Sequence, residues 1–141
     1  MSVSFSFGHV AVTGVYPSAA HQLLLGVEAD FRVTVGLLEV MHEPHFPIVE
    51  LRQWLRLWLS AGASDDFVYT SIEAEDEGLL TFQRAGGSRW IVDSAWSTLI
   101  RPPVVDLSCL VLACERFVDD VDYWVASELG VDVSQVVGDL R

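Results

Sequence analysis

Carboxylates gather at two places in this sequence, and they are the side chains best suited to chemistry or binding. One group lies in a predicted turn and the other on a predicted helix: Glu73, Glu75, Asp76, Glu77, Glu115, Asp119 and Asp122. General acid–base catalysis requires two carboxyl groups in different environments, at least one of them partly buried. A tight turn and the polar face of a helix both face water, so neither group is predicted to be catalytic. Exposed charges of one sign steer association with an oppositely charged protein, and the pattern favours binding of a basic partner.

Two histidines stand close enough in sequence to suggest a metal site. They occur in the run His42-Glu43-Pro44-His45. A helical zinc site of the type His-Glu-x-x-His needs its histidines four residues apart on one helical turn. Here the spacing is three and a proline lies between them, so we predict a turn with two solvated histidines. No metal and no other cofactor is expected.

The two cysteines, Cys109 and Cys114, fall in the apolar half of a predicted helix. Thiols there are usually buried and inert, because a reactive cysteine needs an electropositive environment. The sequence has no Gly-x-Ser-x-Gly nucleophile motif, and Gly86-Gly87-Ser88 is typical of a turn rather than of a phosphate-binding loop. We therefore expect no catalytic residue, and a binding function is favoured over an enzymatic one.

Charge and composition narrow the class of partner. The chain has 141 residues, of which 20 are acidic and 8 are basic, giving a net charge of -12, yet 51% are hydrophobic. This balance predicts one well-packed domain over residues 1–141 with a negative surface, which repels nucleic acid and anionic membranes. The N-terminal residues lack the pattern of a signal peptide, and no apolar run approaches the length of a membrane span. With two reduced thiols, these features predict a cytoplasmic protein.

The elements that carry these residues follow from hydrophobic periodicity. Alternation predicts a strand over residues 2–7 and a hairpin over 27–42 with its turn at Gly36, and Pro44 and Pro47 are expected to halt the second strand. One helical turn is expected over 21–25. A helix over 48–59 follows Pro47, with Arg52, Gln53 and Arg56 on its outer, polar face.

Three further strands, roughly 67–73, 79–84 and 90–96, are predicted next. Asp106 is a good N-cap for a helix over 107–129, which Gly130 would end. Residues 131–141 are predicted to be an edge strand or a loosely held tail. Together these elements predict an α+β fold, in which two main helices pack on an antiparallel sheet of about five to six strands.

Several short runs resemble a family of small uncharacterised acidic proteins common in actinobacteria. The runs are residues 28–33 (EADFRV), 43–51 (EPHFPIVEL), Trp58-Leu59 and Phe117-Val118. The resemblance covers roughly residues 27–128 and implies an α+β fold without implying an activity. In size, charge and lack of catalytic residues the chain is also similar in type to the immunity proteins that neutralise polymorphic toxins.

The leading hypothesis is a protein-binding module, an immunity-type inhibitor that docks an acidic face onto a basic toxin, nuclease or other effector. Two alternatives stay open. The first is a nucleic-acid mimic that inhibits a DNA-binding protein, which requires carboxylates in rows spaced like phosphates. The second is a small enzyme or ligand-binding domain, whose pocket would be lined by tryptophans: Trp54, Trp90, Trp96 or Trp124.

Overall fold

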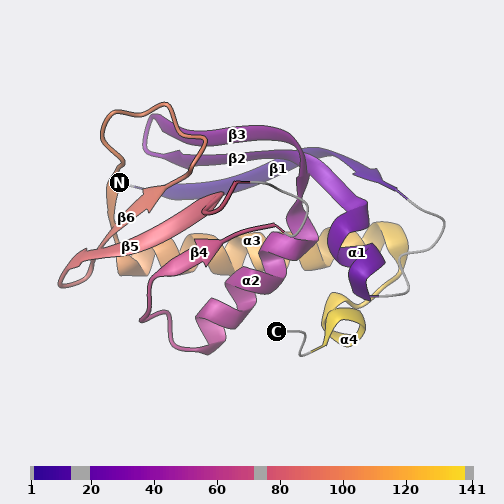
Figure 1. The fold of residues 1–141 in the computed structure, drawn as a ribbon. Coiled ribbons are helices and arrows are strands. Elements are labelled where there is room, and N and C mark those ends of the chain that lie inside the picture. Colours follow the sequence, from indigo (N-terminus) through magenta and orange to yellow (C-terminus); the bar gives the residue numbers. More distant parts are fainter. Residues whose placement is uncertain (1, 14–19, 72–75, 139–141) are drawn as a thin grey trace.

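A computed structural model describes residues 2–13, 20–71 and 76–138 of the chain. This part of the molecule contains two antiparallel sheets and four helices, which confirms the α+β class (Figure 1). The first sheet has three strands in the order β1 (Val3–Val12), β2 (Val27–Val35) and β3 (Leu38–Pro47). The second has four strands, in the order β4 (Phe67–Tyr69), β5 (Leu80–Gly86), β6 (Arg89–Asp93) and β7 (Val104–Asp106).

The predicted hairpin is present, but its second strand is longer than expected. Gly36 lies in the turn with φ 58°, a conformation that glycine adopts without strain. β3 does not stop at Pro44: it pairs with β2 as far as Pro47. The register shifts between the pairs Ala29–Phe46 and Phe31–Glu43, so the extra residue is absorbed in a β-bulge.

Helix α2 (Ile48–Ser60) is the reason that the molecule has two sheets. It follows β3 directly and, at 1.5 Å per residue, carries the chain about 20 Å before β4 begins. β4 then pairs with β5 in the second sheet. The prediction of one sheet of about five to six strands is therefore wrong, because the strands on either side of α2 were assumed to be neighbours. The short β7 was also not anticipated.

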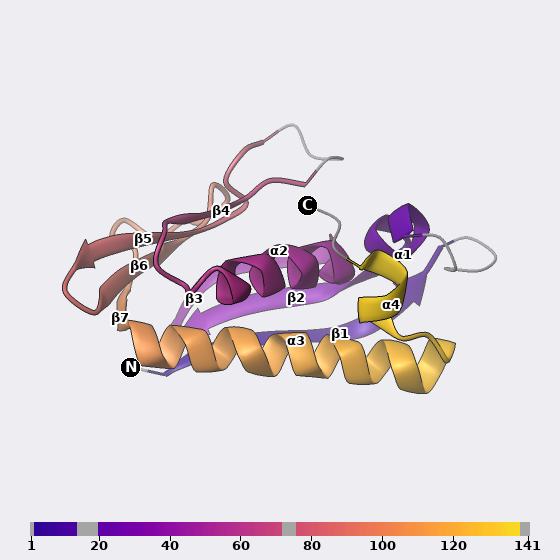
Figure 2. The same ribbon diagram turned by 90° about the horizontal axis from the view of Figure 1, so that it is seen from below.

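Helix α3 (Leu107–Leu129) follows β7 without a loop and agrees with its prediction. The Asp106 side chain accepts a hydrogen bond from the Ser108 backbone N–H, and Gly130 ends the helix at φ 64°. α3 lies beside α2, and both cover one face of the first sheet (Figure 2). Among the described residues, neither α3 nor any other helix is both long and apolar enough to cross a membrane.

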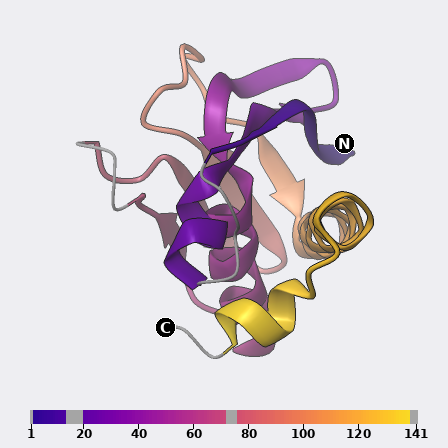
Figure 3. The same ribbon diagram turned by 90° about the vertical axis from the view of Figure 1, so that its right-hand side faces the viewer.

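Two short helices pack together at one end of the molecule (Figure 3). α1 (Ala20–Gly26) agrees with the predicted helical turn. α4 (Val133–Val137) lies where an edge strand or a loose tail was expected, so that prediction is wrong. Asp132 caps α4 by accepting a hydrogen bond from the Gln135 backbone N–H. Val133 and Val137 are buried four residues apart, which is a helical spacing that the alternation of valines concealed.

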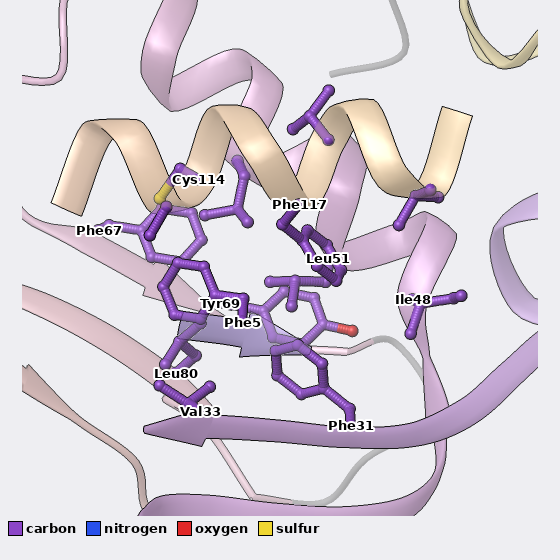
Figure 4. Close-up of a cluster of buried hydrophobic side chains, with 14 of the residues drawn as sticks. Phe5, Phe31, Val33, Ile48, Leu51, Phe67, Tyr69, Leu80, Cys114 and Phe117 are labelled. Carbon is purple, nitrogen blue, oxygen red and sulfur yellow. The ribbon is translucent and has the colours of Figure 1, made fainter. Parts of the chain in front are cut away.

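Aromatic rings join the two sheets and the helices in one core (Figure 4). Phe5 on β1 stacks on Phe82 of β5 at a ring distance of 6.1 Å, and this contact crosses from one sheet to the other. Phe117 of α3 is fully buried and meets Phe31 of β2 at 5.4 Å. Trp58 of α2 meets Phe82 at 5.2 Å. The core is therefore continuous through all the layers.

We predict that Phe117→Ala lowers the free energy of unfolding by about 3–5 kcal/mol, the usual cost of a cavity left by a buried phenylalanine. Urea denaturation monitored by tryptophan fluorescence measures this loss. The control is Tyr123→Ala on the same helix, where the side chain is 75% exposed. That variant should change stability by less than about 0.5 kcal/mol. Equal effects of the two substitutions would contradict the assigned core.

Candidate functional site

The acidic turn is only partly described by the structure. Glu73 and Glu75 lie outside the described residues. Asp76 and Glu77 are both exposed, as predicted for a turn. The Oδ2 atom of Asp76 accepts a hydrogen bond of 2.8 Å from the indole N–H of Trp96. Asp76 therefore also has a local structural role, because it fixes the orientation of a half-exposed tryptophan.

The outer face of α3 carries two of the predicted site residues. Glu115 and Asp119 are exposed and lie one helical turn apart, so they project in the same direction. We call the exposed side chains around them the α3 outer face: Leu112, Glu115, Arg116, Asp119, Asp120 and Tyr123. Leu112 is 49% exposed and Tyr123 is 75% exposed. The outer face thus combines three carboxylates and one guanidinium with two large apolar groups.

Asp122 has a different environment, because it forms a bidentate ion pair with Arg52 of α2. The Nε–Oδ1 distance is 2.7 Å and the Nη2–Oδ2 distance is 2.9 Å. The Arg52 side chain is 3% exposed and that of Asp122 is 35% exposed. The expected position of Arg52 on the outer face of its helix is wrong, and Asp122 is not a solvated carboxylate. Its charge is compensated inside the fold.

Arg52 and its neighbour Gln53 connect α2 to α4 as well. The Arg52 guanidinium donates to the Ser134 hydroxyl at 3.1 Å and to the Gln53 side-chain oxygen at 2.9 Å. The Gln53 amide donates to the Gly138 carbonyl at 3.4 Å. One signal in the sequence marks this burial. Arg52 lies four residues after Ile48 and three before Leu55, which places it in the apolar stripe of the helix.

A groove of about 520 Å³ lies beside this cluster, between the end of α3 and α4. Its lining includes Asp122, Asp132 and Ser134. Asp122 and Ser134 are bound to Arg52, and Asp132 caps α4. Since the polar groups of the groove already have structural partners, the groove offers little for a ligand to bind.

A smaller pocket lies where the two sheets approach each other. Its volume is about 150 Å³, and its lining comes from β2, β3 and the segments beside β4, β5 and β6: Glu28, Glu43, Pro44, His45, Phe46, Pro47, Ser71, Leu79 and Trp96. Of the tryptophans suggested for a pocket, Trp96 lies here and is 36% exposed. Trp90 is a core residue, 2% exposed. Sequence analysis missed the pocket because its lining is contributed by distant segments.

The histidines and cysteines have separate surroundings. His42 lies 3.5 Å from a Glu39 carboxylate oxygen, whereas His45 lines the pocket. Within residues 2–13, 20–71 and 76–138, no group of three or more His, Cys, Asp or Glu side chains is placed to hold a metal ion. Burial raises the pKa of the Cys114 thiol far above its ordinary value, and the nearby charge of Glu115 raises it further. That thiol therefore stays protonated and is a poor nucleophile.

Comparison with known proteins identifies a family but no activity. The sequence model of DUF7878, described as a domain of unknown function, matches residues 3–127. The chain belongs to the DUF7878 family. Searches of curated proteins and of solved structures found no match. The DUF7878 match includes the α3 outer face and every residue that lines the smaller pocket, whereas α4 lies beyond it.

We predict that Asp122→Ala destabilises the protein by about 2 kcal/mol, because it leaves the buried Arg52 charge without its partner at a partly exposed site. Asp119→Ala, on the solvent side of the same helix, is the matched control and should cost less than about 0.5 kcal/mol. Denaturant unfolding compares the two variants. Arg52→Met gives a second test, because it removes the hydrogen bond from Arg52 to Ser134 of α4. Hydrogen exchange at the backbone amide of Gly138 should then become faster. Equal stability of the two aspartate variants would show that the ion pair does not stabilise the fold.

Proposed function

We propose that this protein is a binding module that docks the α3 outer face onto a basic protein, in the manner of an immunity-type inhibitor of a toxin or other effector. One observation carries the proposal. Glu115, Asp119 and Asp120 lie on a rigid, capped helix between two exposed apolar side chains, Leu112 and Tyr123. Acidic residues that served only solubility would not require large apolar groups beside them.

The two kinds of side chain would have different tasks. Tyrosine is enriched among the residues that contribute most to interface affinity, since it buries a large area and loses little conformational entropy. The carboxylates would accelerate encounter with a positive surface, aided by the net charge of -12. Because α3 is 23 residues long and capped at both ends, the face is formed before binding and little ordering cost arises.

The same face favours a protein partner over mimicry of nucleic acid. Arg116 lies among the carboxylates, and a positive charge interrupts any row that would imitate phosphates. The exposed Leu112 and Tyr123 also have no counterpart in a phosphate backbone. Asp76 and Glu77 belong to a separate turn, and Asp122 is compensated by Arg52, so none of these three residues is included in the proposed docking face.

Kinetics with a purified basic partner test the proposal. The protein first serves as bait in a lysate of its source at low salt, and the captured basic protein is then purified. Glu115→Arg combined with Asp119→Arg should slow its association about tenfold or more at low ionic strength, and the difference should shrink as salt is added. Arg116→Glu should have the opposite effect and increase the association rate.

Surface-based association measurements on the wild type and both variants give these rates, and thermal unfolding confirms that the fold is kept. Tyr123→Ala should act mainly on dissociation, because it removes a contact without changing charge. An association rate that is unchanged in both charge variants at low salt would refute docking through this face.

A further inference from the structure

The exposed side of α3 has the residue spacing of a helix–helix interface. Four of its side chains follow one another at intervals of four, three and four residues: Leu112, Arg116, Asp119 and Tyr123. Ala126 continues the series three residues later, and all five are exposed. Alternating steps of three and four residues keep side chains on one line of a helix, and coiled-coil helices contact each other along such lines. We call these five residues the α3 stripe.

No other described part of the chain covers the α3 stripe. Figure 3 shows α3 end-on at the edge of the molecule, with the rest of the fold to one side of it. The exposed fraction is 75% for Tyr123 and 49% for Leu112. Within the described residues, Arg116 and Asp119 have no hydrogen bond or ion pair. The stripe is therefore open to another molecule along its length.

The stripe is complementary to a second copy of itself. When two α3 helices run antiparallel about a twofold axis between residues 116 and 119, each contact occurs twice, because both copies use the same surface. In this register Arg116 faces Asp119 of the second copy, and Leu112 faces Tyr123 of the second copy. A parallel arrangement would instead place arginine against arginine and aspartate against aspartate. Charge and apolar contacts therefore both favour the antiparallel pair.

We propose that the protein forms a weak antiparallel dimer through α3, in which Arg116 of each copy pairs with Asp119 of the other. A contact along one helix buries less than the roughly 1,200–2,000 Å² of stable complexes, so we expect a Kd on the order of 100 µM. Glu115 and Asp120 lie on either side of the stripe and carry the same charge in both copies. Their mutual repulsion also keeps the pairing weak.

Self-pairing covers the surface that we propose for a basic partner. A chain in the dimer cannot present the α3 outer face, so dimerisation and docking exclude each other. This consequence rests on the function proposed above, whereas the pairing itself does not. The dimer would hold the docking face in a protected form that dissociates as the chain is diluted or as a tighter partner appears.

Sedimentation velocity of the purified protein tests the pairing, over concentrations of about 10 to 1,000 µM that bracket the expected Kd. Arg116→Asp places aspartate against aspartate at the centre of the dimer, and Asp119→Arg places arginine against arginine. Because the twofold axis repeats each change, each variant should weaken self-association about tenfold or more. A wild type that stays monomeric throughout, or a dimer that neither substitution weakens, would overturn the proposal.

A mixture of the two single variants tests the register. The Arg116→Asp chain and the Asp119→Arg chain complement each other when antiparallel, so an equimolar mixture should form a heterodimer about as stable as the wild-type dimer. Both chains keep a negative net charge, since the wild type carries -12, and general attraction between them cannot explain such a heterodimer. Glu39→Arg makes the same charge change on β3 and is the matched control. Mixed with Arg116→Asp, it should give about tenfold weaker association, and equal association of the two mixtures would refute the register.

The salt dependence separates self-pairing from docking. Added salt screens the repulsion between two chains of charge -12 and should strengthen the dimer, whereas it should slow association with a basic protein. Thermal unfolding of each variant confirms that the fold is kept. Since self-association is measured on the protein alone, failure of the dimer and failure of docking are distinguishable.

Discussion

The burial of α2 is the constraint on which the rest of the structure depends. Residues 48–53 are buried without interruption, so the first half of the helix is covered on all sides, whereas Trp54 and Arg56 in its second half are exposed. An unpaired guanidinium in that position would cost several kcal/mol. Asp122 removes this cost by pairing with Arg52, and the buried Glu50 accepts a hydrogen bond of 2.6 Å from the Tyr69 hydroxyl. These polar contacts fix where α3 and β4 lie against α2, and the aromatic core fills the space between them.

This constraint divides the acidic residues into two kinds. Glu50 and Asp122 are held by partners inside the structure, whereas Asp106 is exposed but accepts hydrogen bonds from Ser108 and Ser88, which keep its pKa below its ordinary value. Glu115 and Asp119 are exposed and unconstrained by such partners in the described part of the chain. A net charge of -12 therefore overstates the charge available to a partner. What matters for recognition is the position of the carboxylates that the fold leaves uncompensated.

Sequence patterns predicted local structure well and tertiary pairing poorly. The helix phase alone placed Glu115 and Asp119 on a solvent face. Gly36 marked the turn of the hairpin, and Gly130 marked the end of α3. The number of sheets was wrong because strand pairing across α2 depends on where the helix delivers the chain. Arg52 was misplaced because its charge was given more importance than its position in the apolar stripe, and the partner that compensates the charge lies 70 residues away on another helix. The pocket was missed because its lining comes from segments that lie far apart in the sequence, and because residues 43–47 were predicted to be a turn rather than a strand with a bulge.

The α3 outer face and the smaller pocket differ in what holds them together. The α3 outer face belongs to one capped helix, so it persists as long as that helix is folded. The pocket needs Glu28 and Glu43 from the first sheet and Leu79 and Trp96 from segments beside the second. Its shape therefore depends on the aromatic contacts between the sheets, such as that of Phe5 with Phe82. A change that loosens this junction would impair the pocket before it affected the helix face, and the two surfaces can be separated experimentally for that reason.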